Sequence, residues 1–429
     1  MKMSDSVNHI IKSRRRFLGS LIALGLANTG LTSWKNPMIK NKLHNNAEDS
    51  FNDLKITRIR FYQAPSRFMV NQSSHIVTVE TDKDITGVGE GGTAYLVKQL
   101  AGLLIGKNPL QIEHLWQLMY RGHFYPPGRE KIHALGALDM ALWDIKGKVL
   151  NVPVHMLLGG TARNHIECYV TGYPGNKSLK EKARSAIDEG FRAFRISVAD
   201  PRNGTSSFNA RHAITDTVKS CEEVREGVGT DGAWCIDYHT RLDLNDAVRL
   251  SSLIEDFEPF FVEDLIRSEN PGVYQKLREL VKVPIAVGEQ FGDRWDISEM
   301  IEKNWIDYSR ISLPNSGGIT EFMKISALCE THYIGLVPHF TGPIATAALV
   351  HACVPYSGPV LMEMLGNKKP DLPHLPVSYD FNDGKIWPND RPGLGVEVDV
   401  KNLELSAEVT EYEQGVPQFF RPDGSFTNW

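Results

Sequence analysis

Three acidic residues end short apolar segments at equal spacing in the second half of the chain. Asp237 closes AWCID, Glu263 lies near the end of FFVED, Glu289 closes PIAVGE, and 26 residues separate each acid from the next. Three carboxylates brought together repel one another strongly unless a cation lies between them. Oxygen ligands favour a hard ion, and Mg²⁺ leaves positions for water or substrate oxygens. The pattern predicts one Mg²⁺ per subunit; for each acid alone, a helix N-cap or a surface charge is the alternative.

The segments that must position these acids repeat about every 25 residues from residue 166 onward. There are eight of them: 166–170, 193–198, 233–237, 260–264, 284–289, 307–312, 333–339 and 359–363. Polar stretches with apolar residues at helical spacing lie between them, which indicates parallel βαβ units. Eight units close a (β/α)₈ barrel, an α/β fold in which all strand C-termini open onto one face. The alternative is a doubly wound sheet, but no glycine-rich phosphate turn follows these segments.

Composition excludes several classes of protein. The chain has 429 residues, with 47 Lys and Arg against 52 Asp and Glu, and 41% of its residues are hydrophobic. This is typical of a globular protein with room for two or three domains. A net charge of −5 without a long basic segment gives no indication of nucleic-acid binding. The five cysteines form no CxxC pair, so we expect neither a zinc site nor a disulfide framework.

The N-terminal residues have the pattern of a targeting signal. Arg14-Arg15-Arg16 precedes an apolar run from Phe17 to Ala27, which is too short to span a membrane. Paired arginines before such a run indicate a twin-arginine export signal, here residues 1–31, followed by a polar linker, residues 32–53. We therefore expect a periplasmic protein without stable membrane association after cleavage. A basic amphipathic helix of a cytoplasmic protein is the alternative.

The segments around the acids resemble the enolase superfamily, in particular its mandelate racemase/muconate lactonizing enzyme-like branch. The resemblance runs from CIDYH, FFVED and VGEQ to GVGEGG, GALDMALWDIKGKVLNVPVHMLLGG, NSGGITE and PGLGVE, and covers roughly residues 55–429. It implies an α+β capping domain over residues 54–160 and a barrel over residues 161–375. The C-terminal segment, residues 376–429, would return to the capping domain, and a homo-oligomer is expected.

The resemblance also assigns roles to strand-end residues outside the three acids. His339 matches the base that removes the proton next to a substrate carboxylate, and His239 matches an acid that protonates a departing 3-hydroxyl. Glu363 matches an acid that contacts the substrate or the enediolate. The alternatives are a structural loop histidine for His339, an orienter of a metal ligand for His239 and a structural carboxylate for Glu363. The period of two in strands would place His239 on the same side as Asp237.

Departures from the family pattern include the ends of the second and sixth strands. Lysines are often found after the second strand, where this chain has Arg195 and Ser197; arginine is a poor base but can pair with a substrate carboxylate. We expect Arg195, Ser197 and Arg310 to bind substrate. The acid expected to orient His339 aligns with Ser312, which removes a constraint on its tautomer.

The expected function is that of a carbon–oxygen lyase. DYHTR and HFTGPIATAA resemble galactonate dehydratases, whereas AFRIS and IDYSR are more similar to mannonate dehydratases. We expect a Mg²⁺-dependent dehydratase that converts a sugar acid into a 2-keto-3-deoxy acid. The alternatives are an epimerase or racemase of a hydroxy acid, or a metal- and ligand-binding homologue without turnover. Substrate choice is expected to depend on the loops at 67–73 and 121–129.

Overall fold

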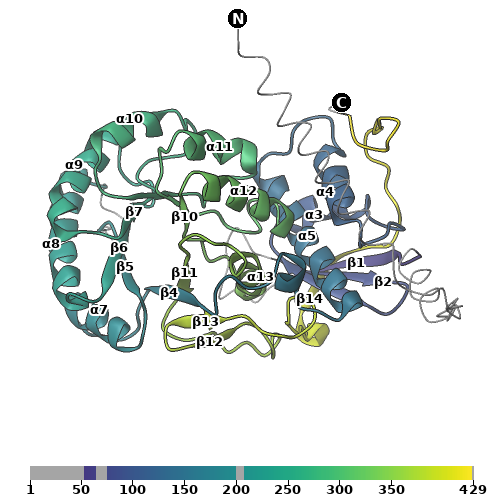
Figure 1. The fold of residues 1–429 in the computed structure, drawn as a ribbon, viewed down its shortest axis with the longest axis horizontal. Coiled ribbons are helices and arrows are strands. Elements are labelled where there is room, and N and C mark those ends of the chain that lie inside the picture. Colours follow the sequence, from purple (N-terminus) through teal and green to yellow (C-terminus); the bar gives the residue numbers. More distant parts are fainter. Residues whose placement is uncertain (1–52, 64–74, 200–206, 428–429) are drawn as a thin grey trace, which may run out of the picture. The chain divides into compact units, whose positions relative to one another are not determined.

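The eight apolar segments predicted as strands each contribute a strand to one sheet. The strands are β4 (Ile166–Thr171), β5 (Ala193–Ser197), β6 (Ala233–Asp237), β7 (Phe261–Glu263), β8 (Ile285–Val287), β9 (Tyr308–Ser309), β10 (Gly335–Leu336) and β11 (Leu361–Leu365). Parallel pairing runs in chain order from β4 to β10, and β11 pairs in parallel with β4. A parallel bridge from Leu336 to Val360 joins the last two strands. Within the described residues these strands close a ring, which confirms the predicted (β/α)₈ barrel (Figure 1).

This computed structural model describes residues 53–63, 75–199 and 207–427, which belong to one unit of the fold, residues 51–429. The predicted export signal, residues 1–31, lies outside the described residues. So do the linker up to residue 52 and the predicted specificity loop 67–73. Among the helices of the described ranges, none has both the length and the apolarity needed to cross a membrane.

The barrel helices lie outside the ring of strands, as α7 to α10 show in Figure 1, and most of them bury one face, whereas α13 is buried along its whole length. They are α7 (Leu179–Asp188), α8 (Ala210–Val228), α9 (Leu244–Ile254), α10 (Val273–Leu280), α11 (Arg294–Glu302), α12 (Ile319–Thr331) and α13 (Pro343–Cys353). In α9 the buried residues Ala247, Leu250, Ser251 and Ile254 follow helical spacing. Helix α7 begins with a capping box between Ser178 and Glu181.

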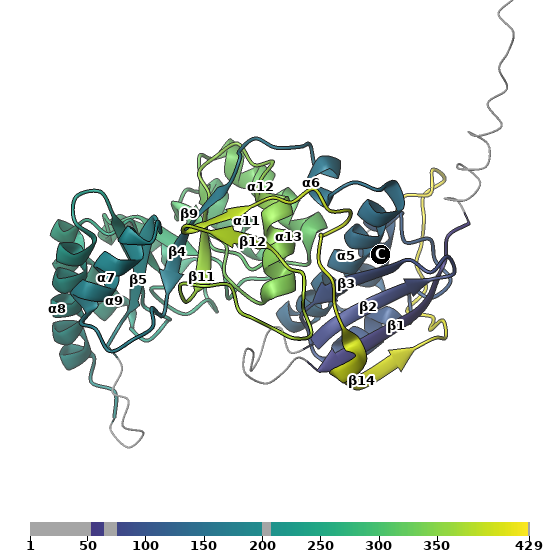
Figure 2. The same cartoon turned by 90° about the horizontal axis from the view of Figure 1, so that it is seen from below.

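The capping domain is an antiparallel sheet with helices on one face (Figure 2). Its strands are β1 (Ile56–Gln63), β2 (His75–Thr81), β3 (Thr86–Glu90) and β14 (Glu404–Val409), and its helices are α3 (Ala94–Ala101), α4 (Ile112–Arg121), α5 (Arg129–Leu150) and α6 (Val154–Leu157). Helix α5 packs directly on β3. A Cβ at Gly87 or Gly89 would lie 2.1 or 1.9 Å from a carbonyl oxygen of α5, so glycine permits this close approach.

The C-terminal segment contributes to both sheets. Strand β14 pairs antiparallel with β1 of the capping domain. Before it, β12 (Asp380–Asn382) and β13 (Lys385–Trp387) form a hairpin whose second strand pairs with β4 of the barrel. Two short 3₁₀ helices complete the described elements, Glu255–Phe257 and Val400–Asn402. The domain boundaries at 160 and 375 stay a prediction.

Candidate active site

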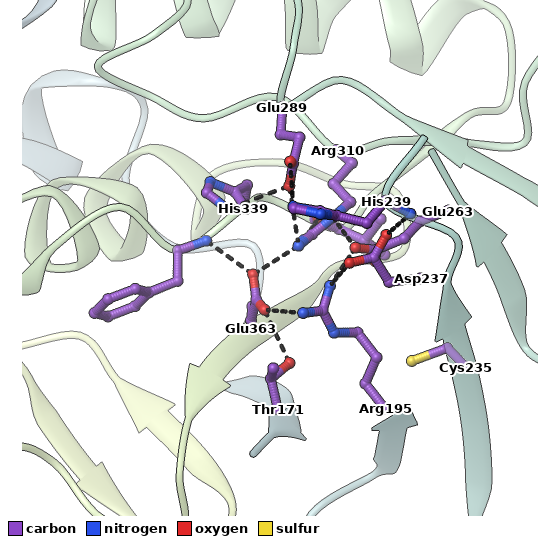
Figure 3. A network of polar contacts seen from close by, with 12 residues as sticks. Thr171, Arg195, Cys235, Asp237, His239, Glu263, Glu289, Arg310, His339 and Glu363 are labelled. Carbon is purple, nitrogen blue, oxygen red and sulfur yellow. Dashed lines mark hydrogen bonds and ion pairs between the residues drawn. The ribbon is translucent and has the colours of Figure 1, made fainter. Parts of the chain in front are cut away.

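The polar residues of the candidate site lie directly beyond the apolar interior of the barrel. Side chains on a strand alternate, so that residues two positions apart point the same way. This step of two leads from six members of a buried cluster, Tyr169, Ala193, Cys235, Phe261, Val337 and Leu361, to Thr171, Arg195, Asp237, Glu263, His339 and Glu363. Glu289 is the exception, because it lies three residues after Ala286 of the same cluster. Because the strands are parallel, these second residues gather at the C-terminal end of the barrel (Figure 3). The structure thus brings together the strand-end residues selected from sequence.

Arg195 connects three of the carboxylates. Its Nη1 atom lies 3.2 Å from Oδ2 of Asp237 and in contact with Glu263, and its Nη2 atom lies 3.4 Å from Oε1 of Glu363. Figure 3 shows the guanidinium directed towards Asp237 and Glu363. The side chain is only 10% exposed. In this structure Arg195 therefore compensates the charge of the acids, and its role in substrate binding stays a prediction.

Arg310 lies among the same acids and is almost completely buried. Its Nε atom is 2.8 Å from Oε1 of Glu263, and its Nη2 atom is 2.8 Å from Oε2 of Glu363 and 3.7 Å from Oε2 of Glu289. Its Nη1 atom donates a hydrogen bond of 2.5 Å to the hydroxyl of Tyr169. With 1% of the side chain exposed, Arg310 acts on the site through the carboxylates in this structure. The expected direct contact with substrate stays a prediction.

The two guanidiniums tune the ionisation of the acids. Burial raises the pKa of Glu263, and the charges of Arg195 and Arg310 oppose that rise. Burial also acts on Glu363, but there the two arginines prevail and hold its pKa well below the usual range. Glu289 has a lowered pKa because His339 and Arg310 outweigh its burial. Asp237, Glu263, Glu289 and Glu363 are thus the acids that these two guanidiniums contact (Figure 3).

The two histidines lie on either side of Glu289. Nε2 of His339 is 3.2 Å from Oε2 of Glu289, and Nε2 of His239 is 3.8 Å from Oε1. Nδ1 of His339 lies 2.8 Å from the hydroxyl of Ser312, which can donate to it or accept from it. Burial lowers the pKa of His339, and the charge of Glu289 opposes this. Glu289 therefore lies within reach of both imidazoles.

The backbone around His239 differs from the expected strand. Strand β6 ends at Asp237, and His239 and Thr240 have φ angles of 49° and 56°. The alternation of a strand does not apply in this left-handed turn, so the argument that placed His239 by a period of two is wrong. The turn is held instead by the amide of His239, which donates to Oδ1 of Asp237 at 2.6 Å. The imidazole still reaches the site and is 56% exposed.

Glu363 is fixed by four neighbours. It accepts hydrogen bonds from Thr171 Oγ1 at 2.9 Å, from the Phe340 amide at 3.1 Å and from Arg310, and it also pairs with Arg195. Its predicted contact with the substrate stays a prediction. Ser197, at the end of β5 and in register with Asp237, is exposed at the same end of the barrel.

The donor set suits a hard cation, although no group of three or more His, Cys, Asp or Glu in the described ranges has the arrangement of a metal centre. Guanidinium groups lie between the predicted ligands Asp237, Glu263 and Glu289. Oε2 of Glu263 is buried without a hydrogen-bond partner. A carboxylate oxygen of this kind is an appropriate Mg²⁺ ligand, because Mg²⁺ prefers hard oxygen donors. The residues fit Mg²⁺, and the ligand set itself stays a prediction.

Sequence reasoning missed three residues of this site. Thr171 contacts Glu363, and Tyr169 contacts Arg310. Thr171 could have been identified from its place as the polar residue at the end of the first barrel strand. Asp264 follows Glu263 in FFVED and is fully buried, with a φ of 44° and an unpartnered Oδ2. Burial and the charge of Glu289 raise its pKa well above the usual range.

Comparison with known proteins decides the family. Residues 57–159 match the mandelate racemase/muconate lactonizing enzyme N-terminal domain, and residues 178–402 match the enolase C-terminal domain-like family. The chain belongs to the mandelate racemase/muconate lactonizing enzyme family. Its capping domain and barrel are the two domains of that family, and the predicted resemblance to the enolase superfamily is confirmed. Members of this superfamily use Mg²⁺.

Relatives within the enolase superfamily are named as dehydratases. A D-galactonate dehydratase from Xanthomonas oryzae pv. oryzae is 35% identical over 397 residues, which cover 88% of this chain and all of the relative. A crystal structure from Salmonella enterica serovar Typhimurium, provisionally named a dehydratase, has a TM-score of 0.78 at 26% identity, covering 83% of this chain and all of that one. An enolase from Pantoea ananatis with bound D-gluconate and Mg has a TM-score of 0.72 at 26% identity, covering 81% of this chain and 93% of that one.

Proposed function

We propose that this protein is a Mg²⁺-dependent dehydratase of a sugar acid. The observation that carries the proposal is the pair of imidazoles, His339 and His239, directed at one carboxylate among the strand-end acids. The 35% identity to a D-galactonate dehydratase over 88% of the chain supports the reaction class, and the bound D-gluconate of a structural relative supports the substrate class.

The reaction removes a proton and a hydroxyl from neighbouring carbons. His339 takes the proton from the carbon next to the substrate carboxylate, and the electrons of that C–H bond form an enediolate. The 3-hydroxyl then leaves with its bonding electrons as His239 gives it a proton, so that water departs. The resulting enol becomes a 2-keto-3-deoxy acid by proton transfer. When bound to Asp237, Glu263 and Glu289, Mg²⁺ would supply a Lewis acid for the carboxylate end of the substrate.

The exposure of the two histidines suits this division of roles. His239 is 56% exposed, which leaves room for a hydroxyl that departs as water. His339 is 20% exposed and is oriented by Ser312 on one nitrogen and by Glu289 near the other. A serine in place of a carboxylate provides a hydrogen bond without a negative charge. The base is therefore oriented but receives less electrostatic support from this neighbour than an acid would give it.

Incubation of the protein with Mg²⁺ and a panel of aldonates and uronates tests the proposal. We expect a 2-keto-3-deoxy product from at least one aldonate, and no product with Asp237→Asn. Exchange of the α-proton with solvent without elimination would indicate an epimerase or racemase. Binding without either reaction would indicate a homologue without turnover. The last two outcomes both contradict the proposed dehydration.

We further propose that the protein is exported through the twin-arginine route to the periplasm. Support comes from Arg14 and Arg15 before the apolar run in the sequence, which lies outside the described residues. That route carries folded proteins, which suits an enzyme that folds around a metal ion. The expected homo-oligomer remains a prediction of the family resemblance.

A further inference from the structure

A buried glutamate of the capping domain touches the barrel helix that follows His339. Glu90 ends β3, within the GVGEGG segment, and is 3% exposed. Its Oε2 atom accepts hydrogen bonds from the amides of Ile344 at 2.8 Å and Ala345 at 2.9 Å. These amides belong to the first turn of α13, so one carboxylate of the cap satisfies the start of a barrel helix 254 residues later in the chain.

The Glu90 carboxylate lies directly against the backbone of Gly342, the residue before α13. A Cβ on Gly342 would lie 2.4 Å from carboxylate atoms of Glu90. The φ of Gly342 is 174°, an extended conformation open to any residue, so a larger residue here would not strain the backbone but would have to displace the Glu90 carboxylate. Pro343 has no amide hydrogen, and the Thr346 amide is bonded to the Gly342 carbonyl at 2.8 Å. The two amides that remain in this turn are those bound by Glu90.

The two amides bound by Glu90 lie five and six residues after the proposed base, His339. Residues 337–342 join β10 to α13, and His339 lies within this segment. At its first end, the His339 amide donates to the Ile311 carbonyl at 3.3 Å and the Phe340 amide donates to Glu363 at 3.1 Å. At its other end, Glu90 holds α13. A segment of this length fixed at both ends leaves the His339 backbone little freedom.

We propose that Glu90 is a positioning residue for His339, which it holds towards Glu289 and Ser312 by anchoring the start of α13. The inference rests on the proposed role of His339 in proton transfer. A carboxylate oxygen that accepts from the first amides of a helix satisfies groups that the helix itself leaves unbonded, and here it also ties the loop of the base to the capping domain. The cap thereby influences the proton-transfer step without touching the substrate through Glu90.

Two substitutions at Glu90 separate positioning from simple stabilisation. Glu90→Ala removes the acceptor, whereas Glu90→Gln keeps a carbonyl oxygen for the α13 amides. Asp144→Asn is the control matched to Glu90→Gln, because Asp144 is also buried and accepts from the Val88 amide of the same strand and from Leu394, away from the His339 loop. It also pairs with Lys148 at 2.6 Å, so this substitution removes a buried charge elsewhere in the cap. We expect Glu90→Ala to lower kcat about 10- to 100-fold with KM within about twofold, since small misplacements of catalytic groups cost this much. Glu90→Gln should recover most of kcat, and Asp144→Asn should leave kcat unchanged.

Amide hydrogen exchange gives a readout that needs no substrate. Glu90→Ala should accelerate exchange in residues 339–346 by about tenfold or more, whereas Asp144→Asn should not. If no sugar acid is turned over, the exchange result alone decides the positioning claim, and only the proposed function fails. Equal kcat and equal exchange in that segment for Glu90→Ala and wild type would overturn the inference.

A double-mutant cycle checks that the contact itself is responsible. Gly342→Ala should lower kcat in the wild type, because its Cβ meets the Glu90 carboxylate. In the Glu90→Ala background that clash is absent, so the same substitution should cost clearly less. Additive effects of the two substitutions would contradict a role that passes through this contact.

Discussion

Replacement of Arg310 by methionine tests whether the acids of the site depend on built-in positive charges. Methionine keeps a long, flexible side chain but removes the guanidinium. In the wild type this group lies 2.8 Å from both Glu263 and Glu363 and 3.7 Å from Glu289, with 1% of the side chain exposed. The substitution would leave Arg195 to pair with Asp237, Glu263 and Glu363.

The expected loss of folding stability in Arg310→Met follows from the burial of this ion pair. Removing one partner of a buried ion pair costs about 3–5 kcal/mol, because the other charge is left uncompensated away from water. The sign of the pH dependence follows from Glu363, whose pKa the arginines hold well below its usual range. A depressed carboxyl pKa contributes stability above its unfolded value of about 4.3 and loses it as the pH falls. The difference between wild type and variant should therefore be largest at neutral pH and shrink below about pH 4.

Urea unfolding of both proteins at pH 7, without and with Mg²⁺, measures this difference. We expect the variant to unfold at lower urea without Mg²⁺ and to recover part of its stability with it, because the ion supplies the missing charge. Arg267→Met is the control, since Arg267 pairs with Glu269 on the surface and should show no measurable change. Equal midpoints for Arg310→Met and Arg267→Met without Mg²⁺ would refute the reasoning.

Three further predictions concern the base, the export signal and a buried acid. His339→Asn should abolish both elimination and α-proton exchange, whereas His239→Asn should stop elimination and keep slow exchange; exchange that persists in His339→Asn would show that another group is the base. Replacing Arg14 and Arg15 by lysine should retain the protein in the cytoplasm with its purified activity intact, and unchanged fractionation would contradict twin-arginine export. Burial raises the pKa of Asp139 to about 7, so folding stability should fall as the pH rises from about 4 to 7. In the wild type this titration should lower the free energy of unfolding by about 3 kcal/mol between pH 5 and 8, and Asp139→Asn should remove that decrease. Denaturation curves measured at several pH values test this, and the same pH dependence in both proteins would exclude the titration.

The sequence by itself determined the barrel and the strand-end residues. Apolar segments and their spacing are local properties, and each of the eight segments became a strand because its side chains are buried. Parallel strands then bring their C-terminal ends together whatever the details of the loops. Asp237, Glu263 and His339 could therefore be selected before any contact was known. In the structure, the alternation of side chains along each strand appears as the step of two residues from the buried cluster to the site.

Tertiary structure decided how these groups are paired. The burial of Arg310 among three acids depends on β7, β8, β9 and β11 closing into one ring, which no local pattern encodes. The left-handed conformations of His239 after β6 and of Asp264 after β7 likewise became visible only in the folded backbone, because Asp and His also occur in continued strands.

The contact of Glu90 with α13 joins residues 254 positions apart. The sequence GVGE indicates only that Glu90 is the polar end of a strand. The packing of the capping domain on the barrel is needed to show what the Glu90 carboxylate binds. Buried polar groups must find partners, and in this protein those partners come from distant parts of the chain. Local sequence therefore determined which groups reach the site, and long-range packing determined their charges and orientations.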